Sequence, residues 1–232
     1  MTIAMPLPDA DTLARRDEIA AAMRAIVPGE GVIADADALR RVRERVGYQR
    51  IVLDLAGRRA LQPGAVHVDF SGIAKGYSVD LVAERLQALG HTDFLVEVGG
   101  ELRACGQRPG NQPWRVAVAS MADQSTPLAL PLRDMAIATS GDHWHAFEQG
   151  GRRYSHTIDP RSGEPVAHGL TSVTVLHAEC MQADALATVL TVLGPREGLD
   201  FAEQRGVAAL LCERTAQGPA MAMTTAFAAL LP

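Results

Sequence analysis

The sequence predicts an α+β fold in which antiparallel sheets are combined with helices that follow one another in tandem. Strand-like segments outnumber helical ones, and several form adjacent pairs separated by glycine-containing turns. The helical segments do not alternate with the strands, as they would in a doubly wound parallel sheet. The chain has 232 residues, of which 47% are hydrophobic, and this is enough for one substantial core or two small ones.

The expected helices are segments in which apolar residues recur at helical spacing between good helix formers. The third helix begins at Ser78, a favourable N-cap residue, and ends before Gly90. The fourth ends at Gly194, directly before the fifth. The five expected helices are residues 11–26, 35–47, 78–89, 181–194 and 195–206.

The expected strands are short runs of β-branched and aliphatic residues between turn signals. Glycine pairs at Gly99–Gly100 and Gly150–Gly151 indicate that two of the longer segments are hairpins. The C-terminal tail can add one more strand. The segments are residues 50–55, 66–70, 94–106, 114–120, 135–142, 143–159, 170–178 and 207–213.

Composition excludes several classes of function. The net charge is −5 and aromatic residues make up 4% of the chain, so the sequence predicts no nucleic-acid binding. The three cysteines, Cys105, Cys180 and Cys212, form no C-x-x-C pair, which argues against a zinc site or a redox dithiol. No apolar run approaches the roughly 20 residues of a membrane span, so none is expected. The N-terminus has no secretory signal pattern, and as written it predicts a cytoplasmic protein.

Lys75 is the only lysine, whereas the other 21 of the 22 basic residues are arginines. It lies in "DFSGIAKG", between an expected strand and an expected helix, where glycines permit close approach of a ligand. A helix N-terminus favours anions, and a lysine there suits a phosphate or a flavin carbonyl. The segment is not a Walker loop. A surface lysine in an ordinary turn explains these residues equally well.

Three further segments carry candidate chemistry, and each has a plainer explanation. "ATSGDHWHAF" contains an expected anion-binding turn at residues 139–141, and its two histidines, His143 and His145, suit either a metal or solvent. "SHTIDPRSGEP" presents His156 either as a proton carrier or simply on a hairpin turn. "QADALATVL" places Asp184 and Thr188 on one helical face, where they can hold one hard cation or only support the helix.

Taken together in order, these motifs resemble those of the ApbE family, the FAD:protein FMN transferases. The matching segments are "DFSGIAKGYSVD", "VGGELRACG", "ATSGD", "HTIDPRSG" and "ADALAT", and the resemblance covers roughly residues 33–215. It implies a T-fold-like α+β architecture with FAD in a cleft and Mg²⁺ at its pyrophosphate. It also explains why one lysine remains, because Lys75 matches the family lysine beside the flavin.

The resemblance implies a role for each matched position. The metal ligands would be the Gly72 carbonyl, Asp184 and Thr188. The flavin- and phosphate-binding residues would be Asp69, Lys75, Thr139, Ser140, Gly141 and the Ile158 backbone. His156 and Asp159 are the two candidates for the catalytic base, and the residues do not decide between them.

The implied reaction is attack of a Thr or Ser hydroxyl of a target flavoprotein on the FMN phosphorus of FAD, with release of AMP and dependence on Mg²⁺. The expected partners are FAD as substrate and the acceptor flavoprotein, with a homodimer as a candidate assembly. Two alternatives remain: a non-catalytic FAD-binding module, and a pyrophosphatase that converts FAD to FMN and AMP.

The resemblance is to a short form of the family. We find no counterpart of an F-D-[PV]-T-like stretch that family members carry in a longer N-terminal region. The expected domains are therefore an N-terminal helical segment, residues 1–31, without a clear family match, and an ApbE-like flavin transferase domain, residues 32–232. Residues near that stretch help to enclose the flavin, so a more open pocket is expected. The family alternative for the compartment is the periplasm.

Overall fold

The computed structural model describes residues 36–62, 64, 66–118, 128–141, 147–149 and 152–231. It divides into two compact units, Met1–Asp69 with Pro160–Gly163, and Phe70–Asp159 with Glu164–Pro232. The predicted helix over residues 11–26 and the predicted domain boundary between residues 31 and 32 lie outside the described residues. His143 and His145 lie outside them as well.

The first unit contains a helix and a small hairpin. Helix α3 (Ala36–Arg43) is followed by a 3₁₀-helix, η2 (Tyr48–Arg50), and by the antiparallel strands β1 (Val52–Asp54) and β2 (Arg59–Leu61). The predicted helix over 35–47 therefore ends earlier than expected. The predicted strand over 66–70 is wrong. Only the first of these residues, Val66, is buried, so their apolar alternation has no buried face on which a strand would pack.

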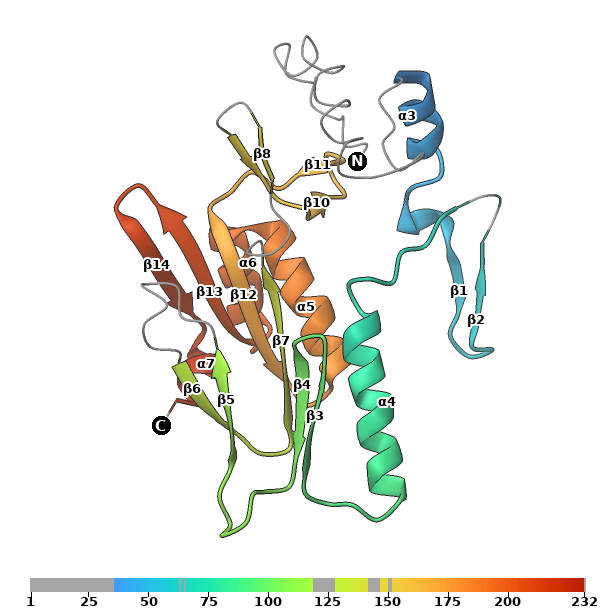
Figure 1. Ribbon diagram of the computed structural model, residues 1–232. Coiled ribbons are helices and arrows are strands. Elements are labelled where there is room, and N and C mark those ends of the chain that lie inside the picture. Colours follow the sequence, from blue (N-terminus) through green and yellow to red (C-terminus); the bar gives the residue numbers. More distant parts are fainter. Residues whose placement is uncertain are drawn as a thin grey trace. The chain divides into compact units, whose positions relative to one another are not determined.

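The second unit is built on a six-stranded antiparallel sheet (Figure 1). Its strand order is β14-β13-β12-β7-β4-β3, and neighbouring strands far apart in sequence, such as β4 and β7, are paired directly. This confirms the predicted α+β class with antiparallel sheets, and the six-stranded sheet is open. The strands are β3 (Phe94–Val98), β4 (Glu101–Cys105), β7 (Met135–Gly141), β12 (Leu170–His177), β13 (Ala208–Thr215) and β14 (Gly218–Met223).

Three helices cover one face of this sheet: α4 (Ala74–Ala88), α5 (Cys180–Leu193) and α6 (Pro195–Gln204) (Figure 1). The predicted tandem helices are α5 and α6, and Gly194 between them has a positive φ of 85° that suits glycine. Buried Val173 and Val175 of β12 pack against Ala187 and Leu190 of α5. This packing fixes the helix that carries the predicted metal ligands.

The opposite face is covered by the hairpin of β5 (Trp114–Val118) and β6 (Leu128–Leu132) and by the short helix α7 (Thr225–Ala228). Leu130, Leu132 and Phe227 are fully buried there. Strand β6 was not predicted, and it contains a proline, Pro131, a residue that is found in sheets mainly on edge strands. Among the described strands β6 pairs with β5 alone, so Pro131 lies on an edge strand, where its missing N–H is tolerated.

Two short hairpins complete the second unit. Strands β8 (Phe147–Gln149) and β9 (Arg152–Tyr154) confirm the hairpin predicted over Gly150–Gly151. Strands β10 (Ile158–Asp159) and β11 (Glu164–Pro165) bracket the Asp-Pro turn.

Helix α4 begins four residues before the predicted N-cap. Ser78 does not cap it, and instead its hydroxyl donates a hydrogen bond to the Lys75 carbonyl at 2.7 Å within the first turns. The residue at the N-cap position, Ile73, makes no side-chain cap bond. Lys75 therefore lies in the first turn of the helix rather than in a turn before it. The glycines at positions 72 and 76 suggested a loop, but contacts with α5 stabilise the helix there.

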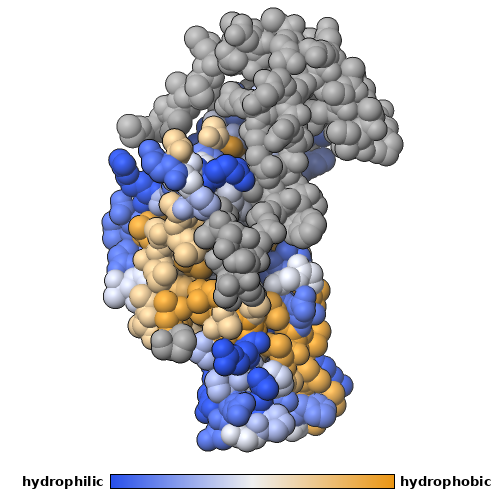
Figure 2. Space-filling model, turned by 60° about the vertical axis from the view of Figure 1, so that its left-hand side comes forward, coloured by the Kyte–Doolittle hydropathy of each residue, from blue (hydrophilic) through white to orange (hydrophobic). Residues whose placement is uncertain are grey.

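Among the described residues, no helix is both long and apolar enough to cross a membrane. The surface combines hydrophilic and apolar patches (Figure 2). Several large apolar side chains are exposed, including Tyr77 and Leu81 of α4 and Leu89, which directly follows it.

Candidate functional site

Helices α4 and α5 meet at Gly76. A Cβ atom at this position would lie 2.5 Å from the Cys180 carbonyl oxygen and 2.7 Å from the Met181 Cα, so only glycine fits without displacing the α5 backbone. The Gly76 N–H donates a hydrogen bond of 3.0 Å to Oδ2 of Asp184. The close approach of the two helices therefore brings a backbone donor of α4 onto the carboxylate of α5.

Asp80 fixes the start of α5 from the neighbouring helix. Its carboxylate accepts hydrogen bonds from the backbone N–H groups of Cys180 at 2.9 Å and Met181 at 2.8 Å, and it pairs with Arg103 of β4 at 2.6 Å. The first N–H groups of a helix have no partner within the helix, so this buried carboxylate acts as a cap supplied by another element. It determines where the face of α5 that carries Asp184 lies relative to α4.

The structure brings the three predicted metal ligands together. Asp184 and Thr188 are one turn apart on α5, and the Asp184 side chain is buried. A Cβ atom on Gly72, in the turn before α4, would lie 3.5 Å from Oγ1 of Thr188. Gly72 and Thr188 therefore lie close together, and Asp184 is one turn from Thr188 on α5.

Lys75 projects from the first turn of α4 onto Glu101. Its Nζ atom lies 2.5 Å from Oε1 of Glu101, whose side chain is only 2% exposed. The aliphatic part of the lysine passes over the β3–β4 turn, because a Cβ on Gly99 would meet the Lys75 Cδ at 3.1 Å. The predicted flavin-binding lysine therefore has a buried acidic partner.

The carboxyl groups of Asp184 and Glu101 both have raised pKa values. Burial raises the pKa of Asp184, and the Gly76 N–H and the Lys75 charge only partly oppose this. Burial also raises the pKa of Glu101, where Lys75 opposes the effect and the charge of Asp184 reinforces it. The two carboxylates and one lysine therefore interact electrostatically, and when both carboxylates are ionised one negative charge is left uncompensated.

These residues fit a hard divalent cation. Mg²⁺ prefers oxygen ligands and completes its shell with water or phosphate oxygens. Asp184, Thr188 and the Gly72 carbonyl offer oxygen donors of this kind, next to the uncompensated charge. Within the described residues no cluster of three or more His, Cys, Asp or Glu side chains could hold a metal. A cation here would thus depend on carbonyl, hydroxyl and non-protein ligands as well as the carboxylate.

The phosphate-binding turn predicted over residues 139–141 is wrong as a turn: these are the last three residues of β7, and they pair with β12. Thr139 pairs opposite Thr174 of β12, and their hydroxyl groups are hydrogen-bonded at 2.9 Å. Side chains alternate along a strand, so Ser140 shares the face of Ala136 and Ala138, which pack under the helices. Of the two hydroxyl residues, Ser140 is therefore on the side of the sheet that bears α5, and Thr139 is on the other side.

The remaining predicted residues lie on other segments. His156 is exposed, Ile158 is 49% exposed, and Asp159 is half-buried, and the latter two form the short strand β10. The segment is held by hydrogen bonds from Val166 N to Thr157 O and from Thr157 N to Ser155 Oγ. Asp69 is exposed and is the last residue of the N-terminal segment of the first unit. The roles of these residues stay predictions.

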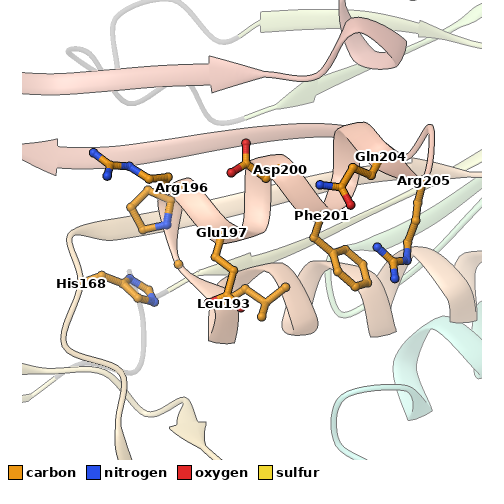
Figure 3. Close-up of a pocket in the computed structure, with 10 residues that line it drawn as sticks. His168, Leu193, Arg196, Glu197, Asp200, Phe201, Gln204 and Arg205 are labelled. Carbon is orange, nitrogen blue, oxygen red and sulfur yellow. The ribbon is translucent and has the colours of Figure 1, made fainter.

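A hollow of about 610 Å³ beside α6 contains none of the predicted residues (Figure 3). His168 at its edge has a fixed hydrogen-bonding role: its Nε2 lies 2.7 Å from the Thr191 carbonyl, and Leu170 N donates to its Nδ1 at 3.3 Å. This assigns the ring hydrogen to Nε2. The residues that line the hollow are His168, Leu193, Gly194, Pro195, Arg196, Glu197, Asp200, Phe201, Gln204 and Arg205.

Two glycines of the motif should respond differently to alanine. Gly76→Ala should reduce the free energy of unfolding by about 1–3 kcal/mol, because the methyl group must push α5 away from α4. Gly72→Ala should have little effect, since a Cβ there meets Thr188 only at ordinary contact distance. Urea unfolding of both variants measures the difference. Equal losses of stability would contradict the close approach at Gly76.

Cys180 should not act as a nucleophile, although it begins α5. Burial, reinforced by the nearby carboxylates, raises the pKa of its thiol to about 12. At pH 8 roughly one thiol in ten thousand would be ionised. We expect alkylation at pH 8, read by peptide mass spectrometry, to modify Cys180 only after denaturation. Rapid modification of the native protein would show that the thiol is accessible and ionised.

Sequence reasoning missed the roles of Glu101 and Asp80. Both lie in the quoted motifs, "VGGELRACG" and "DFSGIAKGYSVD", but their partners are distant in sequence. Glu101 follows a Gly-Gly turn on a strand, and Arg103 lies two residues later, on the same face. An acidic and a basic residue two positions apart face the same side of a strand. On a strand expected to pack under a helix, this spacing was the signal that both could form ion pairs with the helix.

Comparisons with known proteins agree with these motifs. The ApbE family profile matches residues 18–211. A Haemophilus influenzae protein named FAD:protein FMN transferase is 39% identical over 188 residues, which are 78% of this chain and 54% of that protein. A Vibrio cholerae protein of the same name is 44% identical over 155 residues, 66% of this chain and 46% of that protein. The chain thus spans about half the length of the curated relatives it matches.

Two solved structures give the same result for the fold. The apo form of the Pseudomonas stutzeri flavinyl transferase ApbE superimposes with a TM-score of 0.78 and 37% sequence identity, covering 98% of this chain and 76% of that one. The flavin transferase ApbE from Vibrio cholerae gives a TM-score of 0.78 at 30% identity, covering 99% of this chain and 80% of that one. The sequence match and these structures agree: the chain belongs to the ApbE family.

Proposed function

We propose that this chain is a FAD:protein FMN transferase that requires Mg²⁺. The observation that carries the proposal is the convergence of Lys75, Asp184, Thr188 and the Gly72 backbone where α4 meets α5. Oxygen donors for a cation suit a substrate with two linked phosphates, and a lysine ammonium beside them suits a flavin carbonyl of the same substrate. The printed names of the H. influenzae and V. cholerae relatives support the same activity.

The chemistry is the transfer of a phosphoryl group with its riboflavin attached. A Thr or Ser hydroxyl oxygen of the target protein forms a bond to the FMN phosphorus of FAD. The bond between that phosphorus and the bridging oxygen breaks, and AMP leaves with the bridging oxygen. A base removes the hydroxyl proton, and His156 and Asp159 are our two candidates.

The residues of the chain have separate tasks in this proposal. Asp184, Thr188 and the Gly72 carbonyl would hold Mg²⁺, and the bound cation would neutralise pyrophosphate charge. Lys75 binds the flavin part of FAD. Ser140 and Gly141, at the end of β7, bind its phosphates. The Gly76 N–H holds the Asp184 carboxylate in place at 3.0 Å. Most of the catalytic effect expected from such a site is positioning and charge stabilisation.

One incubation tests the proposal against its alternatives. The protein is mixed with FAD, Mg²⁺ and a target flavoprotein domain that has an acceptor Thr or Ser, and a target with that residue changed to alanine serves as control. We expect covalent flavin on the intact target, seen by mass spectrometry, and one AMP released for each flavin transferred. Free FMN with unmodified target would instead indicate a pyrophosphatase. FAD binding without AMP release would indicate a binding module.

A further inference from the structure

We propose that Glu101 is a positioning residue for Lys75, which it holds in place for FAD through a buried carboxylate. This rests on the proposed function for the role of Lys75, but the contact between the two residues is independent of it. The carboxylate is 2% exposed, and it lies 2.5 Å from a lysine Nζ whose side chain is 45% exposed. The lysine thus reaches from a buried anchor toward the surface.

The β3–β4 turn has the shape that this contact needs. Gly99 and Gly100 both have positive φ, at 61° and 100°, and Glu101 follows them directly as the first residue of β4. A side chain at Gly99 would meet Lys75, so the turn leaves room for the lysine stem. The turn and the strand thus supply both the passage for the side chain and the acceptor at its end.

Stability alone does not explain a carboxylate at this position. The second oxygen of Glu101, Oε2, is buried and has no hydrogen-bond partner among the described residues. A buried acceptor without a partner is destabilising, and a buried ion pair is weak evidence for stability. Perturbed buried charges of this kind cluster at functional sites. A role in holding the single lysine accounts for the retained charge.

A second ion pair between the same elements provides a matched control. Arg103 lies two residues after Glu101 on β4 and pairs with Asp80 of α4 at 2.6 Å. Breaking this pair also loosens α4 from β4, but it leaves Lys75 and Glu101 in contact. Any effect that is merely structural should therefore appear in Arg103→Gln as well as in Glu101→Gln.

The experiment uses the fact that Lys75 is the only lysine of the chain. An amine-reactive ester modifies Lys75 and the N-terminal amine, and peptide mass spectrometry gives the rate at Lys75. We expect Glu101→Gln to accelerate this reaction roughly tenfold, since a hydrogen bond to a charged group is lost. The rate for Glu101→Asp should lie between those of the wild type and Glu101→Gln, and Arg103→Gln should react at the wild-type rate. Circular dichroism checks that each variant is folded.

Addition of FAD completes the test. FAD should slow the reaction at Lys75 in the wild type. In Glu101→Gln this protection should be several-fold weaker, because Lys75 is no longer held in position to contact FAD. A wild-type rate in Glu101→Gln, or equal acceleration in Arg103→Gln, would overturn the proposal. If FAD protects Lys75 in no variant, the assignment of Lys75 to FAD fails and with it the positioning role, whereas the rates without FAD still decide the pairing of Glu101 with Lys75.

Discussion

Asp184→Asn should lower Mg²⁺-dependent flavin transfer by about 100-fold or more while the protein stays folded. Asparagine keeps an oxygen that can accept the Gly76 N–H, which now bonds to Asp184 at 3.0 Å. What it removes is the charge that attracts the cation. Even outer residues around a bound metal affect activity by about 10–100-fold, so loss of the proposed carboxylate ligand should have at least this effect. Asp184→Ala should lower turnover to the same extent. It should also be less stable than Asp184→Asn, because it leaves the Gly76 N–H unpaired.

Two measurements separate this effect from general damage. Calorimetric titration should show that Asp184→Asn loses Mg²⁺ binding, while Asp200→Ala, which removes an exposed carboxylate of α6, retains it. Normal Mg²⁺-dependent turnover in Asp184→Asn would refute the metal assignment.

In the absence of metal, the stability of the wild type should depend on pH in a way that Asp184→Asn does not share. Burial raises the pKa of Asp184 above its ordinary value of 3.8, so the native state binds this proton more tightly than the unfolded state. The stability of the wild type should therefore fall as the pH rises from about 4 through the raised pKa. Asp184→Asn lacks this loss, so its stability relative to the wild type should increase with pH over that window. Urea unfolding at several pH values measures the difference.

The sequence predicted the parts of the fold that depend on local pattern. The hairpins over Gly99–Gly100 and Gly150–Gly151 and the tandem helices around Gly194 were expected because turn residues and periodicity are local signals. Strand β6 and the true start of α4 were missed. Both depend on tertiary contacts: β6 on its pairing with β5, and the first turn of α4 on its approach to α5.

The candidate site shows the same limit. The spacing of Asp184 and Thr188 on one helical face could be derived from the sequence, because residues four apart on a helix lie together. That Gly76 donates to Asp184, 108 residues away, could not, and neither could the pairing of Lys75 with Glu101. The motif order indicated which segments carry the site, whereas the contacts between α4, α5 and β4 determine how its charges interact.

Lys75→Arg should weaken FAD binding by roughly 30-fold, which is about 2 kcal/mol, although the charge is kept. The lysine stem passes where a Cβ on Gly99 would lie 3.1 Å away, and its ammonium meets a carboxylate that is 2% exposed. A guanidinium is planar, wider and forked, so it does not present one compact charge to Glu101 and to the cofactor as an ammonium does. We therefore expect the contact with Glu101 and the contact with FAD to be disturbed together.

The control for this prediction is the reverse exchange on the same helix. Arg85→Lys, at an exposed position in the last turn of α4, should bind FAD as the wild type does. Equilibrium titration of flavin fluorescence gives the dissociation constants, with Mg²⁺ held at one concentration. Equal FAD affinity in Lys75→Arg and the wild type would show that the lysine does not contact the cofactor. A loss in Lys75→Arg with no loss in Arg85→Lys would place the effect at the ammonium itself, because both variants keep the net charge of α4 unchanged.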